Sequence, residues 1–190
     1  MHASPIFVMM TNEQLSGILE RWDTMTLLRH ESVDNPAHLP DIMEIALHGK
    51  EQIAWRAAWL CEKINDHHPG ILAPWIDVVT RSLPRIKHHG LRRQLLKIVT
   101  LYPIAEADRG LLTDYCLERL EDTSDPSAVK AHAMQILYNI SEAEPDMKEE
   151  LLQVLEWTLE TGETAGIQAR ARNLANRLRK EIRNRKMAQR

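Results

Sequence analysis

The 190-residue sequence is poor in cysteine and glycine. It has two cysteines, Cys61 and Cys116, and neither belongs to a CxxC pair, so neither a disulfide framework nor a zinc site is expected. It has seven glycines, a low number that fits helices joined by short loops. Aromatic residues are sparse, with one phenylalanine and three tyrosines, apart from five tryptophans. The composition therefore favours helices without covalent cross-links.

Long hydrophobic runs are also missing. No apolar stretch approaches the roughly 18 residues of a membrane-spanning helix. Residues 1–10 contain the apolar segment 6–10, but they lack a basic region, a full-length hydrophobic run and a small-residue cleavage site, so they do not resemble a signal peptide. We expect a soluble, cytoplasmic protein with no membrane partner and a disordered N-terminus over residues 1–10.

The net charge of −3 conceals an uneven distribution. Residues 167–190 contain nine Lys or Arg residues against Glu181 alone, a net charge of +8, which leaves −11 for residues 1–166. A basic segment can contact phosphates. It can also be favoured by the helix dipole near a helix C-terminus, or pair with acidic surface elsewhere in the chain. These three interpretations remain open from the sequence.

An apolar pattern recurs every 38 residues. Counted from an anchor residue, apolar side chains stand at offsets 0, 4, 7 and 11, the spacing of one face of an α-helix. A fixed period of this length is typical of repeat proteins, whose units bury their apolar faces against their neighbours. The four sets are Ile53, Ala57, Leu60 and Ile64; Leu91, Leu95, Ile98 and Tyr102; Val129, Ala133, Ile136 and Ile140; and Ile167, Ala171, Leu174 and Leu178.

Helix boundaries follow from capping and breaking residues. Thr11 and Gln14 fit a capping box that begins a first helix, and a second short helix is expected over 24–31. Gly and Pro residues then divide the chain at the edges of the remaining segments, and no segment alternates like a half-buried strand. The expected helix pairs are 37–48 with 51–66, 71–86 with 89–102, 108–121 with 126–142, and 146–160 with 164–185.

Residues 125–133 (DPSAVKAHA) resemble the start of the second helix of a HEAT repeat, and residues 39–45 (LPDIMEI) and 72–76 (LAPWI) resemble first helices with their proline. The resemblance to the HEAT-repeat, armadillo-like α-solenoid family spans roughly residues 36–180. Two features depart from it: Asp-Pro occurs only in the third repeat, and the first helices keep a looser register. The resemblance implies an all-α protein, an α–α superhelix of about four helical hairpins with extra N-terminal helices. We expect a single solenoid domain over residues 11–182 and a frayed basic tail over residues 183–190.

In a HEAT-like superhelix the second helices line the concave surface. Offsets 2, 6 and 9 lie opposite the core at about 100° per residue, so their side chains are expected to share this surface. We call them the candidate stripe and expect them to bind a partner, because aromatic residues beside Arg are common at interfaces. Two alternatives remain: the tryptophans pack under the N-terminal helices, or the charges are simply solvated. Besides Ala131 and Ala169, the stripe comprises Trp55, Trp59, Glu62, Arg93, Lys97, Thr100, Gln135, Tyr138, Asn173 and Asn176.

Offset five differs between repeats. It holds Ala58, Leu96 and Met134 in the first three repeats but Arg172 in the fourth. A terminal repeat needs a polar outer face. We therefore expect the fourth repeat to act as a C-terminal cap, with Arg179 and Arg183 extending its polar face.

No catalytic or metal-binding pattern stands out. The pairs 67–68 and 88–89 are adjacent histidines rather than histidines one helical turn apart, so no metal is expected. Neither a phosphate-binding glycine loop nor a nucleophile motif is present. We expect a non-catalytic scaffold that binds an unknown protein or peptide, without a cofactor. The alternative is a nucleic-acid-binding protein that resembles the HEAT-like alkylpurine DNA glycosylases, which need a carboxylate in the groove. Glu62 is the only acid on the candidate stripe.

Overall fold

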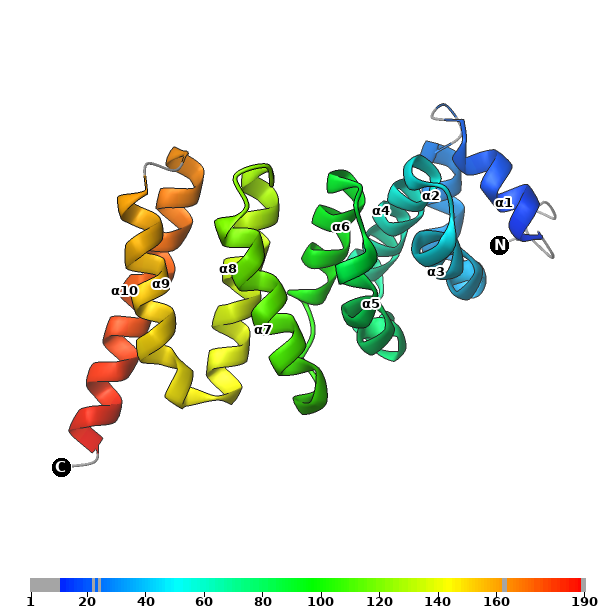
Figure 1. Ribbon diagram of the computed structural model, residues 1–190. Coiled ribbons are helices and arrows are strands. Elements are labelled where there is room, and N and C mark those ends of the chain that lie inside the picture. Colours follow the sequence, from blue (N-terminus) through cyan, green and yellow to red (C-terminus); the bar gives the residue numbers. More distant parts are fainter. Residues whose placement is uncertain (1–10, 22, 24, 162–163, 189–190) are drawn as a thin grey trace. The chain divides into compact units, whose positions relative to one another are not determined.

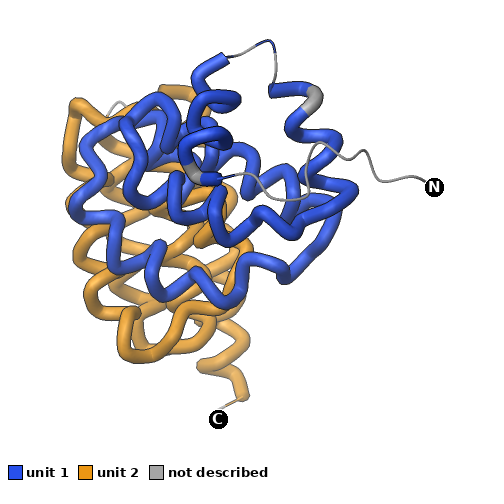
Figure 2. The backbone as a smooth tube through the Cα atoms, turned by 90° about the vertical axis from the view of Figure 1, so that its right-hand side faces the viewer, with its two compact units in different colours: residues 1–95 blue, residues 96–190 orange. Residues whose placement is uncertain are grey.

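A computed structural model describes residues 11–21, 23, 25–161 and 164–188 (Figure 1). The predicted disordered segment 1–10 and Arg190 lie outside these residues. All regular elements among the described residues are helices. The chain divides into two compact units, residues 1–95 and residues 96–190 (Figure 2), with the boundary inside helix α6.

The first unit opens with α1 (Asn12–Leu19) and α2 (Met25–Asp34), the two extra N-terminal helices. The capping box is confirmed, since Thr11 Oγ1 accepts a hydrogen bond from the Gln14 backbone N–H at 3.3 Å and Gln14 Oε1 accepts one from the Thr11 N–H at 2.9 Å. The short 3₁₀ helix η3 (Pro36–His38) leads into α3 (Leu39–His48), which packs against α4 (Glu51–His67) as the first hairpin. Both α1 and α2 contact α4.

The first helix of the second hairpin is shorter than expected. In place of one helix over 71–86, the structure has α5 (Ile76–Ser82) between the 3₁₀ helices η4 (Ala73–Trp75) and η5 (Leu83–Arg85). Pro84 has no N–H to donate to the preceding turn, so the α-helical ladder cannot continue through it. The partner helix α6 (His89–Val99) also ends before residue 102, the predicted end. The backbone N–H groups of Leu101 and Tyr102 donate hydrogen bonds to the carbonyls three residues earlier instead of four.

The second unit contains two longer hairpins. The first is α7 (Glu106–Glu121) with α8 (Ser127–Ala143). The 3₁₀ helix η6 (Pro145–Met147) then leads to α9 (Lys148–Glu160) and α10 (Ala165–Ala188), the second hairpin. Helix α8 also contacts α9 and α10, so the two hairpins pack on each other within this unit.

The repeated apolar pattern forms the core. All four anchor sets are buried, with exposed fractions between 0% and 8%. Offset eight is buried as well, in Cys61, Val99, Leu137 and Ala175. Offset five behaves as the sequence predicts: Ala58, Leu96 and Met134 are fully buried, whereas Arg172 is exposed. The register assigned to the second helices from the sequence is therefore confirmed.

The fraying expected for the basic tail, residues 183–190, stays a prediction, although residues 183–188 are helical in the structure. Helix α10 continues through Ala188, beyond the domain end predicted at residue 182. The prediction counted only apolar contacts, but polar contacts also reach this segment. Arg185 pairs with Asp146 at 2.7 Å and Lys186 pairs with Glu149 at 2.8 Å.

Candidate partner-binding surface

In the first unit, the candidate stripe begins with two tryptophans on α4. Trp55 and Trp59 lie one turn apart and both are half-buried, whereas Arg93 on α6 is exposed. The first turn of α6 lies close to Trp55, because a Cβ atom added to Gly90 would meet Trp55 Cδ1 at 3.5 Å and His88 Cε1 at 2.9 Å. A Cβ atom here would make ordinary contact with Trp55 but would crowd the His88 ring. The two tryptophans are therefore neither fully buried core residues nor fully exposed surface residues.

Glu62 is not on the open surface, which corrects its expected place. Its side chain is 3% exposed. The Gln94 amide of α6 donates a hydrogen bond to Glu62 Oε2, and Lys63 Nζ lies 3.2 Å from Oε1. The helical angle alone pointed Glu62 away from its own hairpin, but the next second helix covers that side. The carboxylate that the glycosylase-like alternative requires is therefore buried.

In the second unit, the stripe residues Lys97, Thr100 and Gln135 are half-buried, and hydrogen bonds link α8 to Thr100 and to α10. The Asn139 amide donates to the Thr100 carbonyl at 3.0 Å, and Gln135 Nε2 donates to Asn139 Oδ1 at 2.8 Å. Gln135 Oε1 in turn accepts a hydrogen bond from Arg170 of α10 at 3.3 Å. Lys97 is half-buried beside them on α6. This part of the stripe is a polar seam between second helices.

Tyr138 belongs to a charged network at the far end of α8. Its hydroxyl donates to Glu181 Oε1 of α10 at 2.6 Å, and Lys148 Nζ lies 2.8 Å from Glu181 Oε2 and also contacts Glu142. Burial and the hydrogen bond to Glu181 raise the pKa of Tyr138 to about 12, so the phenol stays protonated at neutral pH. Burial opposes ionisation of Glu181, but the hydrogen bonds from Lys148 and Tyr138 outweigh it and lower the pKa of this carboxyl. Tyr138 thus has a structural partner.

The last two stripe residues, Asn173 and Asn176, are exposed on α10. Asn176 Oδ1 accepts a hydrogen bond from Arg179 at 3.0 Å. The stripe therefore changes along the chain. It begins with half-buried tryptophans, continues with half-buried polar residues that form hydrogen bonds, and ends with exposed polar residues on α10.

Sequence reasoning missed a polar position at offset three. In the first repeat, Arg56 donates to the carbonyls of Leu19 and Glu20 at 2.7 Å each, and so satisfies the C-terminal end of α1. In the second repeat Gln94 reaches Glu62, and in the fourth Arg170 reaches Gln135. The signal was present in the sequence, because Arg56, Gln94, His132 and Arg170 also stand 38 residues apart. Arg56, Gln94 and Arg170 each connect a second helix to an earlier helix of the chain.

Apart from Arg170, which donates a hydrogen bond to Gln135, the described cations of the basic segment fall into two groups. Three of them pair with acidic residues of the same unit: Arg179 with Glu156 at 2.7 Å, Arg185 with Asp146 and Lys186 with Glu149. The second group is exposed and has no acidic partner within ion-pair distance among the described residues. It comprises Arg172, Arg177, Lys180 and Arg183. Pairing with acidic surface thus accounts for part of the positive charge only.

The histidine pairs take structural roles. His68 forms a 2.7 Å hydrogen bond with the Val33 carbonyl, and His88 Nδ1 accepts one from the Leu91 N–H at 3.1 Å at the start of α6. Within the described ranges, no three His, Cys, Asp or Glu residues gather where they could hold a metal ion. Cys61 and Cys116 are buried free thiols, and burial raises the pKa of both. None of the described helices is long and apolar enough to cross a bilayer.

Comparison with known proteins identifies the family but no close relative. A family model described as a HEAT repeat domain matches residues 11–178. No curated protein and no solved structure matches the chain. The family match covers most of the sequence and agrees with four helical hairpins preceded by two helices. The chain therefore belongs to the HEAT-repeat family, and its fold is an all-α solenoid of helical hairpins.

Proposed function

We propose that this protein is a non-catalytic scaffold that binds a protein or peptide through the part of the candidate stripe that lies in residues 1–95. The observation that carries the proposal is the half-buried pair Trp55 and Trp59 with the exposed Arg93 in the same unit. Tryptophan and arginine dominate the binding energy of many interfaces, and a partly covered ring is already ordered before binding. A cytoplasmic location and the absence of a cofactor are part of the proposal.

The test compares capture of partners by three forms of the full-length protein. The tagged wild type, the double variant Trp55→Ala with Arg93→Glu, and the control Trp157→Ala are incubated with extract of the source organism, and bound proteins are quantified by mass spectrometry. Trp157 is a suitable control because it is 48% exposed and lies outside the stripe. We expect at least one protein to be depleted about tenfold or more with the double variant only, as for loss of a binding hot spot.

Circular dichroism separates loss of binding from loss of fold. The double variant should keep a helical spectrum and a cooperative melt. If it unfolds, the tryptophans are core residues and the stripe is not a binding surface. Equal recovery of every captured protein by all three forms would also contradict the proposal.

The second candidate function is nucleic-acid binding, favoured by the four exposed cations of α10 without acidic partners. Phosphate binding weakens steeply as the salt concentration rises, whereas a peptide anchored by aromatic residues responds less. Burial of Glu62 gives no support to glycosylase-like chemistry within this alternative.

A further inference from the structure

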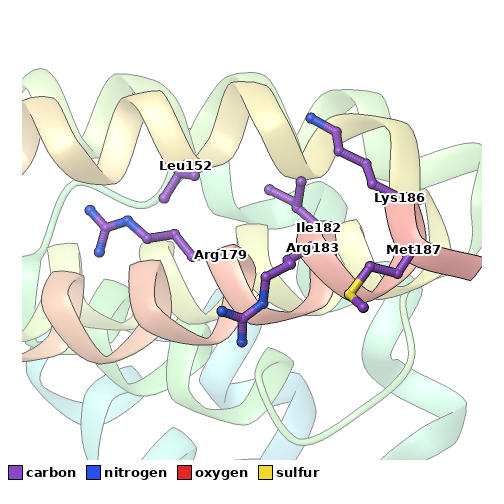
Figure 3. A pocket seen from close by; sticks show the side chains of 6 residues that line it. All are labelled: Leu152, Arg179, Ile182, Arg183, Lys186 and Met187. Atoms are coloured by element: carbon purple, nitrogen blue, oxygen red, sulfur yellow. The ribbon is translucent and has the colours of Figure 1, made fainter.

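A second surface, separate from the tryptophan pair, lies on the α9–α10 hairpin. Leu152 of α9 with Ile182 and Met187 of α10 provide the apolar lining of a pocket of about 390 Å³ (Figure 3). In Figure 3, Leu152 extends from α9 toward α10, and Ile182 and Lys186 extend toward α9. The pocket is completed by Arg179, Arg183 and Lys186, so cations surround an apolar floor.

Two ion pairs bracket this pocket. Glu156 pairs with Arg179, and Glu149 pairs with Lys186. The two acids stand seven residues apart on α9, as the two cations do on α10, so the pairs are two helical turns apart. Leu152 lies between the acids in the sequence, and Ile182 lies between the cations. The ion pairs therefore hold the two helices together on either side of the apolar floor.

Positive charge remains after these pairs are formed. Arg172 and Arg183 are exposed, and neither has an acidic partner among the described residues. They stand eleven residues apart, about three turns or roughly 16 Å along α10. Both lie on the offset-five side of the helix, together with Arg179.

The same side is covered in the preceding repeat. Met134, at offset five of α8, is fully buried in a unit where α9 and α10 pack on α8. On α10 this side is exposed at Arg172, Arg179 and Arg183, and it carries arginines instead of an apolar residue. A purely apolar helix laid here would bury guanidinium groups without partners, which is unfavourable. A helix with acidic flanks would satisfy them.

We propose that the exposed face of the α9–α10 hairpin binds an acidic amphipathic helix of a partner protein. The helix places an apolar side chain over Leu152, Ile182 and Met187, and its carboxylates meet Arg172 and Arg183. This is recognition of a helix in a groove, in which spaced apolar anchors provide affinity and charge sets orientation. The apolar floor favours such a helix over a nucleic acid, which has no side chain to place there.

The test uses a synthetic fluorescent peptide of three heptads, with Leu at positions a and d and Glu at e and g. Fluorescence anisotropy measures its binding to the full-length protein. Two probes serve as comparisons: the same peptide with Lys in place of Glu, and a random-sequence DNA duplex. We expect micromolar binding of the Glu peptide and at least about tenfold weaker binding of the Lys peptide.

Three variants locate the site. Arg172→Glu combined with Arg183→Glu should weaken binding of the Glu peptide by about tenfold or more. Arg177→Glu is the matched control, because Arg177 is also exposed on α10 but stands about 140° around the helix from Arg172, at 100° per residue. It should change binding by less than about threefold. Met187→Gln, at a residue that is 69% exposed, should weaken binding without affecting the fold.

The proposal is overturned if the Glu peptide does not bind at about 100 μM, or if the Lys peptide binds equally well. It is also overturned if Arg177→Glu weakens binding as much as the double variant does, because the effect would then be general charge. Tighter binding of the duplex, lost in the double variant, would identify a nucleic-acid surface instead. The tryptophan pair takes no part in this test, so the result is independent of the scaffold function proposed above.

Discussion

Side chains at the same position of successive repeats differ in burial and in hydrogen-bond partners, because their neighbours differ. At offset three, Arg56 reaches backbone carbonyls of α1, whereas Gln94 reaches a buried carboxylate. At offset nine, Glu62 is buried, Tyr138 donates to a carboxylate of the next hairpin, and Asn176 is exposed. A shared helical angle therefore gives a shared direction but not a shared environment.

The buried register can be tested with two substitutions on α8. Ala133 is fully buried and Gln135 is half-buried. Replacing Ala133 with Glu places a charge in the core and costs several kcal/mol. We expect Ala133→Glu to lower the melting temperature by about 10 °C or to prevent folding. Gln135→Glu faces Arg170 and should have little effect. Equal melting temperatures in thermal circular dichroism would show that the helical register is wrong.

The bond between Gln94 and Glu62 should be energetically coupled. Gln94→Leu removes a donor from a buried carboxylate and should cost about 1–3 kcal/mol. When Gln94→Leu is combined with Glu62→Leu, the loss of unfolding free energy should be smaller than the sum of the two single losses. The reason is that the double variant removes both polar groups, so neither is left buried without its partner. Urea unfolding of the four proteins measures this difference. Additive losses would mean that the hydrogen bond contributes nothing to stability.

Among the elements, α10 depends most on polar contacts. Its last turns contribute Ile182 and Met187 as the larger apolar side chains, yet the helix continues to Ala188. Glu181 connects α10 to two other helices, because it accepts hydrogen bonds from Tyr138 of α8 and Lys148 of α9. Charged pairs and hydrogen bonds thus reach the part of the helix that apolar spacing alone predicts to fray.

The Glu181 network predicts a dependence on pH. The pKa of Glu181 is lowered in the folded state, so its contribution is present above the unfolded pKa of about 4.3 and is lost as pH falls through the folded pKa. Glu181→Gln should cost about 1 kcal/mol at neutral pH, a modest value because the side chain is 31% exposed. Urea unfolding should show this difference shrinking at about pH 3. Glu160→Gln, on the exposed side of α9, serves as the control. A difference that grows on acidification would contradict this account.

At the scale of the whole molecule, the HEAT-repeat fold leaves function to surfaces rather than to a catalytic centre. Two surfaces within separate units carry the proposals: the tryptophan pair in residues 1–95 and the basic, apolar-floored pocket in residues 96–190. Each can be disabled by substitutions in its own unit.

Deletion of residues 183–190 distinguishes the scaffold from a nucleic-acid-binding protein. The Arg185 and Lys186 ion pairs are exposed and worth about 0–1 kcal/mol each, so the melting temperature should change by only a few degrees. The full-length protein should show negligible binding to a random duplex near physiological salt. If it binds DNA, the deletion removes four cations and should flatten the log–log salt slope by up to about 3.6. Micromolar duplex affinity that disappears on truncation would contradict the scaffold proposal.

The sequence by itself determined the register of the second helices and the family. Anchors such as Leu95, Ala133 and Leu174 recur with helical spacing, and a repeat unit can bury such a face only against its neighbours, so their burial follows from periodicity. The capping box is equally local, because both of its partners, Thr11 and Gln14, lie within four consecutive residues.

The tertiary structure alone decided which polar side chains remain available to a partner. Glu62 is covered by Gln94, which lies 32 residues later, and Tyr138 is bonded to Glu181, which lies 43 residues later. The helical angle specifies the direction in which a side chain leaves its own helix. It does not specify whether a long side chain from another helix reaches that side chain and covers it. The two cation groups of α10 were separated for the same reason, because ion pairing depends on acids contributed by α9 and η6.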